Sequence, residues 1–299
     1  MSGTWQSFFN FRPTLLPLGG IAACGYSGEL SNLSAAAGPL TNSRSLAPVL
    51  LGNPGFSGSF DGTANATASY KSLGAAAHAN ISGGIPGSPS ALFESAGAAL
   101  FSDQLTATSP FVAAQTAGSV RYRFHVDGSV TSLGASGAFL FGATYVQLDI
   151  QQNGGPVFGV MSAQVSRGGL GTISGQTPPT GWTTSTGSLS GGSDFFLEQP
   201  MTWAQTWDMK VGLLAWAYGT ADSAFLTTAK ITGLELFDAN HNAVTAFSVA
   251  SASGTDYVNS VPEPASVALM LAGLAGLAGL AGLVLRRLGV LGATGEQAA

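Results

Sequence analysis

Four acidic residues in the second half of the chain are spaced so that they could form two catalytic pairs. Asp194 and Glu198 lie four positions apart, and Glu235 and Asp238 lie three positions apart. Two carboxyl groups about 5–10 Å apart can hydrolyse a glycosidic bond, because one serves as the acid and the other as the base or nucleophile. Any acidic surface supplies such pairs by chance, so this spacing does not predict an enzyme, and we expect no catalytic residues.

A short polar segment, DANHN at residues 238–242, has the side-chain oxygens of a calcium loop at its first, third and fifth positions. Its sixth position, however, is Ala243, where such loops need glycine, and its twelfth is Val249, where they need a bidentate acid. The segment therefore predicts a hairpin turn. The three histidines of the chain also lack a metal-ligand partner at a useful spacing, so we expect neither a metal nor a cofactor.

Tryptophan side chains are the remaining candidates for a binding surface, because their flat apolar rings can stack on sugars. Trp207 alternates in step with the apolar residues Met209, Val211 and Leu213, which predicts that Trp207 lies in the core. Trp216 has the opposite parity, so it would point to the other face of the same strand. If that face is exposed, Trp216 is the best single candidate for a binding contact.

The composition narrows the classes of protein that could carry these residues. The chain has 299 residues, of which 8% are charged, against roughly 25% in an ordinary soluble domain. The net charge of −5 argues against nucleic-acid binding, which needs a basic surface. A single cysteine excludes a disulfide scaffold and multi-cysteine metal sites within the chain. A weakly charged chain rich in glycine, alanine, serine and threonine is common among exported all-β proteins.

Short runs of alternating apolar and polar residues fill the middle of the chain. In residues 119–126 the apolar residues Val120, Tyr122, Phe124 and Val126 alternate with Arg121, Arg123 and His125. The apolar side chains should therefore face the space between two sheets, and the polar ones should point the other way. Residues 203–217 show the same period of two. Turn signals rich in glycine or asparagine separate such runs, at 127–128, 153–155, 167–169, 191–192 and 238–240. We therefore predict an all-β domain over residues 56–257, an antiparallel β-sandwich with jelly-roll-like character.

The first 55 residues show weaker patterns. Residues 1–28 form a weak signal-like segment, because their apolar stretch is short and interrupted by proline and glycine. Within it, Ile21-Ala22-Ala23-Cys24 has the order of a bacterial lipobox, in which Cys24 would be lipidated. The alternative is that this order arises by chance, and the poor signal favours that alternative. Residues 29–55, with three prolines among serine, asparagine and glycine, predict a loop or linker.

Residues 265–285 contain no charged side chain. As a helix they would extend about 32 Å, which matches the roughly 30 Å hydrocarbon core of a bilayer. Arg286 and Arg287 follow immediately, and the positive-inside rule places them and the tail 286–299 on the cytoplasmic side. The sequence therefore predicts one C-terminal transmembrane helix, with the domain before it outside the cytoplasm. The alternative is a buried core helix, which rarely lacks charge on every face.

A short hinge at residues 258–266 precedes this predicted helix. It contains Val261-Pro262-Glu263-Pro264, and two prolines around one acid favour an exposed, extended chain. The order of Pro-Glu-Pro, hydrophobic span and Arg286-Arg287 resembles the PEP-CTERM sorting signal of Gram-negative bacteria, over about residues 260–288. That signal is also labelled the C-terminal region of certain ice-binding proteins. The resemblance implies export and recognition by exosortase, a membrane transpeptidase.

The predicted sandwich also resembles the ectodomains of many PEP-CTERM proteins. The likeness lies in residues 99–106 and 123–128, and in residues 233–240 followed by Val244 and Thr245. It implies a similar β-rich fold and the same export, and it implies no particular reaction.

We therefore predict an exported, surface-sorted and membrane-tethered bacterial protein whose sandwich is periplasmic or at the cell surface. We expect a non-enzymatic component of the envelope or extracellular matrix. Its expected partners are the membrane, an exosortase-type transpeptidase and, as a candidate, extracellular polysaccharide, with no nucleic acid.

Two alternative functions remain open, a carbohydrate-binding module and a surface glycan hydrolase or lyase on a jelly-roll scaffold. Exposed aromatic residues in a row on one sheet face would favour the binding module. Two carboxylates about 5–10 Å apart in a cleft would favour the enzyme. Ice binding needs a flat, regular array of threonines, which the irregular placement of serine and threonine does not suggest.

Overall fold

The computed structural model describes residues 5–15, 31–35, 39–53, 56–84, 91–132, 143–166, 169–175 and 180–258. All of them belong to one compact unit, Met1–Asn259, while Ser260–Ala299 form a second unit. The described part of the first unit consists of β-strands joined by turns and loops. No helix that could span a membrane occurs in these ranges, and the span predicted at residues 265–285 lies outside them.

The strands form two antiparallel sheets, which we name sheet A and sheet B. Sheet A contains β1 (Trp5–Leu15), β2 (Ser31–Ala35), β6 (Ala91–Thr108), β8 (Ala143–Gln152), β9 (Val157–Ser166), β10 (Thr172–Gly175), β13 (Thr206–Tyr218) and β16 (Ser248–Ser251). Their order is β10-β9-β8-β13-β6-β1-β2, with β16 paired to β6.

Sheet B contains β3 (Leu40–Asn53), β4 (Phe56–Ser69), β5 (Ser72–Gly84), β7 (Ala117–Ser132), β11 (Trp182–Ser185), β12 (Ser188–Thr202), β14 (Ala221–Phe237) and β15 (Ala243–Val244). Their order is β11-β12-β7-β14-β5-β4-β3, with β15 paired to β14.

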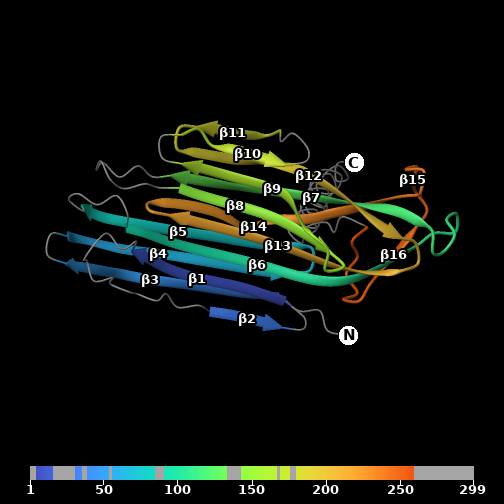
Figure 1. Cartoon of the computed structure of the whole chain (residues 1–299), viewed down its shortest axis with the longest axis horizontal. Helices are drawn as coiled ribbons and strands as arrows, with labels where there is room; N and C mark the ends of the chain where they lie inside the picture. Colours follow the sequence, from blue (N-terminus) through green and yellow to red (C-terminus); the bar gives the residue numbers. More distant parts are fainter. Residues whose placement is uncertain are drawn as a thin grey trace, which may run out of the picture. The chain divides into compact units, whose positions relative to one another are not determined.

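The two sheets pack face to face around one hydrophobic core, and the axes of most of their strands are nearly aligned, with neighbouring strands antiparallel (Figure 1). Sheet A buries Phe101 and Leu148 in this core, and sheet B buries Phe124, Phe195 and Phe225 against them. The prediction of an all-β domain with antiparallel, sandwich-like sheets is therefore confirmed.

Alternation along β7 and β13 explains which side chains enter the core. In β7, Val120 and Tyr122 are buried, while Arg121 and Arg123 point outward. In β13, Trp207 is buried together with the apolar residues that share its parity. Both patterns were predicted from the period of two, and both are confirmed.

One hydrogen-bonded chain crosses the core between the sheets. Tyr122 Oη of sheet B accepts from Trp207 Nε1 of sheet A at 2.9 Å and donates to Gln152 Oε1 at 3.1 Å. Gln152 Nε2 in turn donates to the carbonyl oxygen of Pro200 in β12 at 2.8 Å. Burial raises the pKa of Tyr122, so its hydroxyl stays protonated. Because an unpaired buried polar group costs about 1–3 kcal/mol, these bonds favour one relative placement of the sheets.

The N-terminal part of the chain is more regular than its sequence suggests. The predicted linker at 29–55 is wrong, because most of it forms β2 and β3, and β3 pairs with β4. β3 accommodates Pro48 because it is an edge strand of sheet B and its register with β4 shifts between Leu46 and Val49. Edge strands and bulges are the places where β-sheets tolerate proline. Within the signal-like segment 1–28, β1 pairs with β6. The sandwich therefore begins before β4.

The predicted turns differ in outcome. Asn153 and Gly154 turn the chain between β8 and β9, with φ angles of 51° and 65° that tight hairpins favour. Gly128 and Gly191, by contrast, lie opposite each other inside β7 and β12, which continue without a turn. A Cβ on Gly128 would lie 2.6 Å from the Phe225 ring, so glycine allows close packing there. The turns predicted at 127–128 and 191–192 are therefore wrong.

Candidate functional site

The outer face of sheet A carries Trp216, the residue whose parity in the sequence predicted an outward side chain. Trp216 lies in β13, where Ala215 and Ala217 point into the core and Trp216 points outward, half-buried. Its cross-strand neighbour in β8 is Tyr145, which is also half-buried. Thr144 Oγ1 donates to the Trp216 carbonyl oxygen at 2.9 Å. The structure thus places a second aromatic residue, missed from the sequence, beside Trp216.

Polar side chains continue this face across β8, β9 and β10. The strand register sets two rows, one of Tyr145, Gln164 and Thr172, and one of Gln147, Ser162 and Ser174. Residues that follow each other on one face of a strand are about 7 Å apart, and neighbouring strands are about 4.8 Å apart. The second row therefore forms a polar strip directly beside the aromatic pair.

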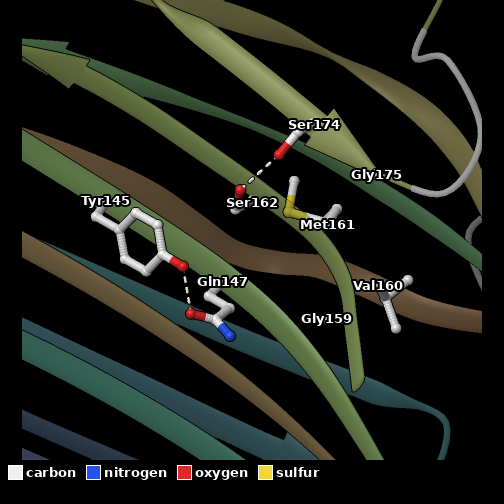
Figure 2. Close-up of a pocket in the computed structure, with 8 residues that line it drawn as sticks. All are labelled: Tyr145, Gln147, Gly159, Val160, Met161, Ser162, Ser174 and Gly175. Carbon is white, nitrogen blue, oxygen red and sulfur yellow. Dashed lines mark hydrogen bonds between the residues drawn. The ribbon is translucent and has the colours of Figure 1, made fainter. Parts of the chain in front are cut away.

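Two hydrogen bonds between side chains of this face join Tyr145 to Gln147 and Ser162 to Ser174 (Figure 2). The Tyr145 hydroxyl donates to Gln147 Oε1. Gln147 Nε2 donates to Asp149 Oδ1 at 2.5 Å. The hydroxyls of Ser162 and Ser174 share a hydrogen bond of 2.8 Å. Burial raises the pKa of Asp149 against the opposing effect of the Gln147 bond, and burial together with the Asp149 charge raises the pKa of Tyr145. The amide of Gln147 is therefore held in one orientation.

Two open surface hollows flank Tyr145. One has a volume of about 330 Å³ and is lined by Tyr145, Gln147, Gly159, Val160, Met161, Ser162, Ser174 and Gly175 (Figure 2). The other has a volume of about 300 Å³ and is lined by Thr144, Tyr145, Gln164, Val165, Ser166, Leu170, Thr172 and Trp216. Every lining residue is uncharged. These residues can stack on a ligand and form neutral hydrogen bonds with it.

The other tryptophans with described side chains do not extend this face. Trp203 and Trp207 are buried in the core. Trp182 lies in sheet B, where its ring stacks on Phe225 with centroids 6.2 Å apart. Trp216 and Tyr145 are therefore the aromatic residues that line the two hollows.

The acidic residues of the proposed catalytic pairs lie elsewhere, mainly on the outer face of sheet B. Strand register places Glu198 of β12 and Glu235 of β14 on either side of Arg121 in β7. Arg121 contacts Glu198 at 3.0 Å and Glu235 at 3.2 Å, and Arg123 contacts Glu235 at 3.0 Å. Partial burial raises the pKa of Glu198, but hydrogen bonds from Ser119 and Arg121 outweigh it, so the net shift is downward. An ionised carboxylate held in this way is a poor general acid.

The two remaining acids are also engaged. Asp194 forms a hydrogen bond of 2.7 Å with His125 Nδ1. Asp238 accepts bonds from the backbone nitrogens of Asn240 at 2.9 Å and Asn242 at 2.8 Å, and from the Asn242 side chain at 3.0 Å. The bonds from Asn242 lower the pKa of Asp238. Asp238 thus caps the turn between β14 and β15, and the predicted hairpin turn is confirmed.

No metal site accompanies these acids within the described ranges, since no group of three or more histidine, cysteine, aspartate or glutamate side chains there could hold an ion. The oxygens of Asp238 that a calcium ion would need are used inside the turn.

A buried carboxylate fastens the last described residues to sheet A. Asp103 in β6 is 4% exposed and accepts bonds from the backbone nitrogens of Gln104 at 2.8 Å and Ser253 at 3.1 Å. It also accepts bonds from the hydroxyls of Ser253 and Tyr257, the latter at 3.0 Å. Burial, together with the Asp103 charge, raises the pKa of Tyr257. The last contacts described between the chain and sheet A are thus made at Ser253 and Tyr257, shortly before the Pro-Glu-Pro segment in the sequence.

The predicted sorting residues and the candidate lipidation residue lie outside the described part of the chain, namely Val261, Pro262, Glu263, Pro264, Arg286, Arg287 and Cys24. No curated protein matches the chain. The family profile of the PEP-CTERM protein-sorting motif, however, matches residues 260–287. This match covers the segment whose residue order carried the resemblance. The chain therefore carries a PEP-CTERM protein-sorting motif, which implies an exported protein that exosortase sorts.

Proposed function

We propose that this protein is a non-enzymatic component of the cell envelope or extracellular matrix, delivered to the cell surface through its C-terminal sorting motif. The match to the PEP-CTERM motif at residues 260–287 carries this proposal. The motif follows shortly after Tyr257, which the buried carboxylate of Asp103 fastens to sheet A. A stable sandwich would therefore be carried to the surface as cargo of the sorting signal.

The C-terminal segment supplies the topology. The uncharged span 265–285 anchors the chain in the membrane, and Arg286 and Arg287 keep its far end in the cytoplasm, since moving an arginine to the bilayer centre costs about 2.5–3.5 kcal/mol. The hinge residues Val261 to Pro264 are then presented on the outer side, where exosortase acts. Exchanging both arginines for glutamate should disturb both the topology and the processing.

The state of the acidic residues supports a non-enzymatic role. Glu198 and Glu235 bind the same arginine, Asp194 binds His125, and Asp238 caps a turn. A glycosidase needs one protonated and one free carboxyl group beside the glycosidic bond. Neither sequence pair provides that arrangement, because each of these carboxylates already has a structural partner.

The proposal is tested in a bacterial host that has an exosortase. When the gene for all 299 residues is expressed, the mature protein should be recovered mainly from the cell-surface and matrix fractions. Incubating it with the host's own extracellular polysaccharide should produce no new reducing ends and no change in polymer size. Depolymerisation that is lost in Glu198→Gln and kept in Asp208→Asn would contradict the non-enzymatic role. Asp208 is a suitable control because it is an exposed acid of sheet A.

A further inference from the structure

We propose that the outer face of sheet A around Trp216 and Tyr145 binds a neutral polysaccharide. We name it the Trp216 face, formed by Trp216, Tyr145, Gln147, Ser162 and Gln164. The inference rests on the proposed function, because it identifies the class of molecule that a matrix component would contact.

The aromatic pair provides a stacking platform. Trp216 and Tyr145 are directly opposite each other in β13 and β8, so their Cβ atoms lie about 4.5–5.5 Å apart on one face. Leu214, the next outward residue of β13, is 38% exposed. Leu170, which lines the same 300 Å³ hollow as Trp216, is 64% exposed. The C–H face of a pyranose ring packs on such a surface, because both are flat and apolar while the hydroxyls of the sugar point to the sides.

The polar strip provides the hydrogen bonds that a sugar needs. Gln147, Ser162 and Ser174 form the row next to the aromatic row, about 7 Å along the strands. This spacing lets a ring on the platform direct its side hydroxyls toward an amide and two hydroxyls. The platform and strip together cross β13, β8, β9 and β10, a width of about 15 Å. That width fits a short stretch of a sugar chain lying across the strands.

The electrostatic properties of this face favour a neutral sugar chain. The residues that line both hollows are uncharged, and the charged group tied to the strip through Gln147 is the acid Asp149. A polysaccharide that carries carboxylates or phosphates would meet no cation among these residues and would be repelled by Asp149. A neutral chain would lose nothing to such repulsion.

Affinity electrophoresis of the full chain, purified in a non-ionic detergent, tests the inference. Native gels would contain hydroxyethyl cellulose, xyloglucan or galactomannan as neutral polysaccharides, and polygalacturonate as an acidic one. We expect at least one neutral gel to retard the wild type. Trp216→Ala should raise the dissociation constant for that polysaccharide at least tenfold. Phe111→Ala is the matched control, because Phe111 is 80% exposed in the loop between β6 and β7 and should bind like the wild type.

A second variant keeps the test valid if Trp216→Ala disturbs the fold. Ser162→Arg fills the hollow from the surface strip without entering the core, so it should also abolish retardation while leaving the melting temperature near the wild-type value. The inference is overturned if no neutral gel retards the wild type, if retardation occurs only in polygalacturonate, or if both variants bind like the wild type. It is also overturned if light scattering shows a dimer that Trp216→Ala dissociates, since a second copy would then cover the face. A correctly sorted protein that binds no polysaccharide would contradict this inference alone, whereas depolymerising activity would contradict the proposed function.

Discussion

The buried carboxylate of Asp103 should control how firmly the end of the sandwich is held. Asp103→Asn keeps the shape of the side chain but removes its charge and replaces one acceptor oxygen by a donor. Four hydrogen bonds converge on this carboxylate, from the backbone nitrogens of Gln104 and Ser253 and from the hydroxyls of Ser253 and Tyr257. The amide can keep accepting from the two backbone nitrogens, so the two hydroxyls must turn and accept from its NH₂ group.

The size of the expected destabilisation follows from the change of a charged acceptor into a neutral one. A hydrogen bond to a charged group contributes about 1.5–3 kcal/mol, against about 0.5–1.5 kcal/mol for a neutral one. Four such bonds weaken, while the cost of burying a charge at a site that is 4% exposed disappears. We therefore expect a net loss of about 2–3 kcal/mol, which corresponds to a fall in Tm of roughly 5–10 °C for a unit of this size.

Thermal unfolding of the fragment Met1–Asn259, followed by circular dichroism, measures this loss. The matched control is Asp208→Asn, the same chemical change at an exposed residue that accepts one bond of 2.8 Å from Gln104 Nε2. The control should melt within about 2 °C of the wild type, since exposed substitutions usually change stability by about 0.5 kcal/mol or less. If Asp103→Asn melts like this control, the carboxylate does not fasten the chain end and the reasoning is refuted.

Two further predictions concern sheet B. Folding lowers the pKa of Glu198. The ionised Glu198 side chain therefore stabilises the fold fully at a pH above the ordinary glutamate pKa near 4.3, and this stabilisation is lost as the pH falls through the lower pKa of the folded state. Glu198→Gln should therefore flatten the acid limb of a plot of Tm against pH, and an unchanged acid limb would count against the Arg121 network. Gly74→Ala should destabilise strongly, by about 3 kcal/mol or more, because its Cβ would lie 1.7 Å from the Leu226 carbonyl oxygen. Gly212→Ala, whose Cβ would meet its first neighbour at 3.8 Å, should melt close to the wild type, and equal melting of both variants would contradict this packing argument.

The directions of side chains could be predicted from the sequence where a strand has one buried face. Tyr122 in β7 and Trp207 in β13 were correctly placed in the core, because a period of two leaves one choice of buried face. The same parity correctly directed Trp216 outward. Its neighbour Tyr145 could not be found in this way, since the pairing of β8 with β13 is a long-range contact that no local pattern encodes.

Local composition was misleading where tertiary contacts decide the structure. Gly128 has the sequence of a turn, but its lack of a side chain makes room for Phe225 from a neighbouring strand. Pro48 suggested a loop, yet an edge strand with a slip in its pairing accommodates it. The acidic residues were paired by their closeness in sequence, whereas the sheet brings Glu198 and Glu235 together around Arg121.

Mass spectrometry of the C-terminal peptide tests the central claim most directly. The sample is the protein recovered from the surface of a host that has an exosortase. We predict that its mature chain ends near Pro264 and lacks the span 265–285, and that Glu263→Ala leaves a longer form in the membrane fraction. Recovery of the surface form with Ala299 still in place, together with a Glu263→Ala variant that behaves like the wild type, would contradict the claim that the motif directs sorting.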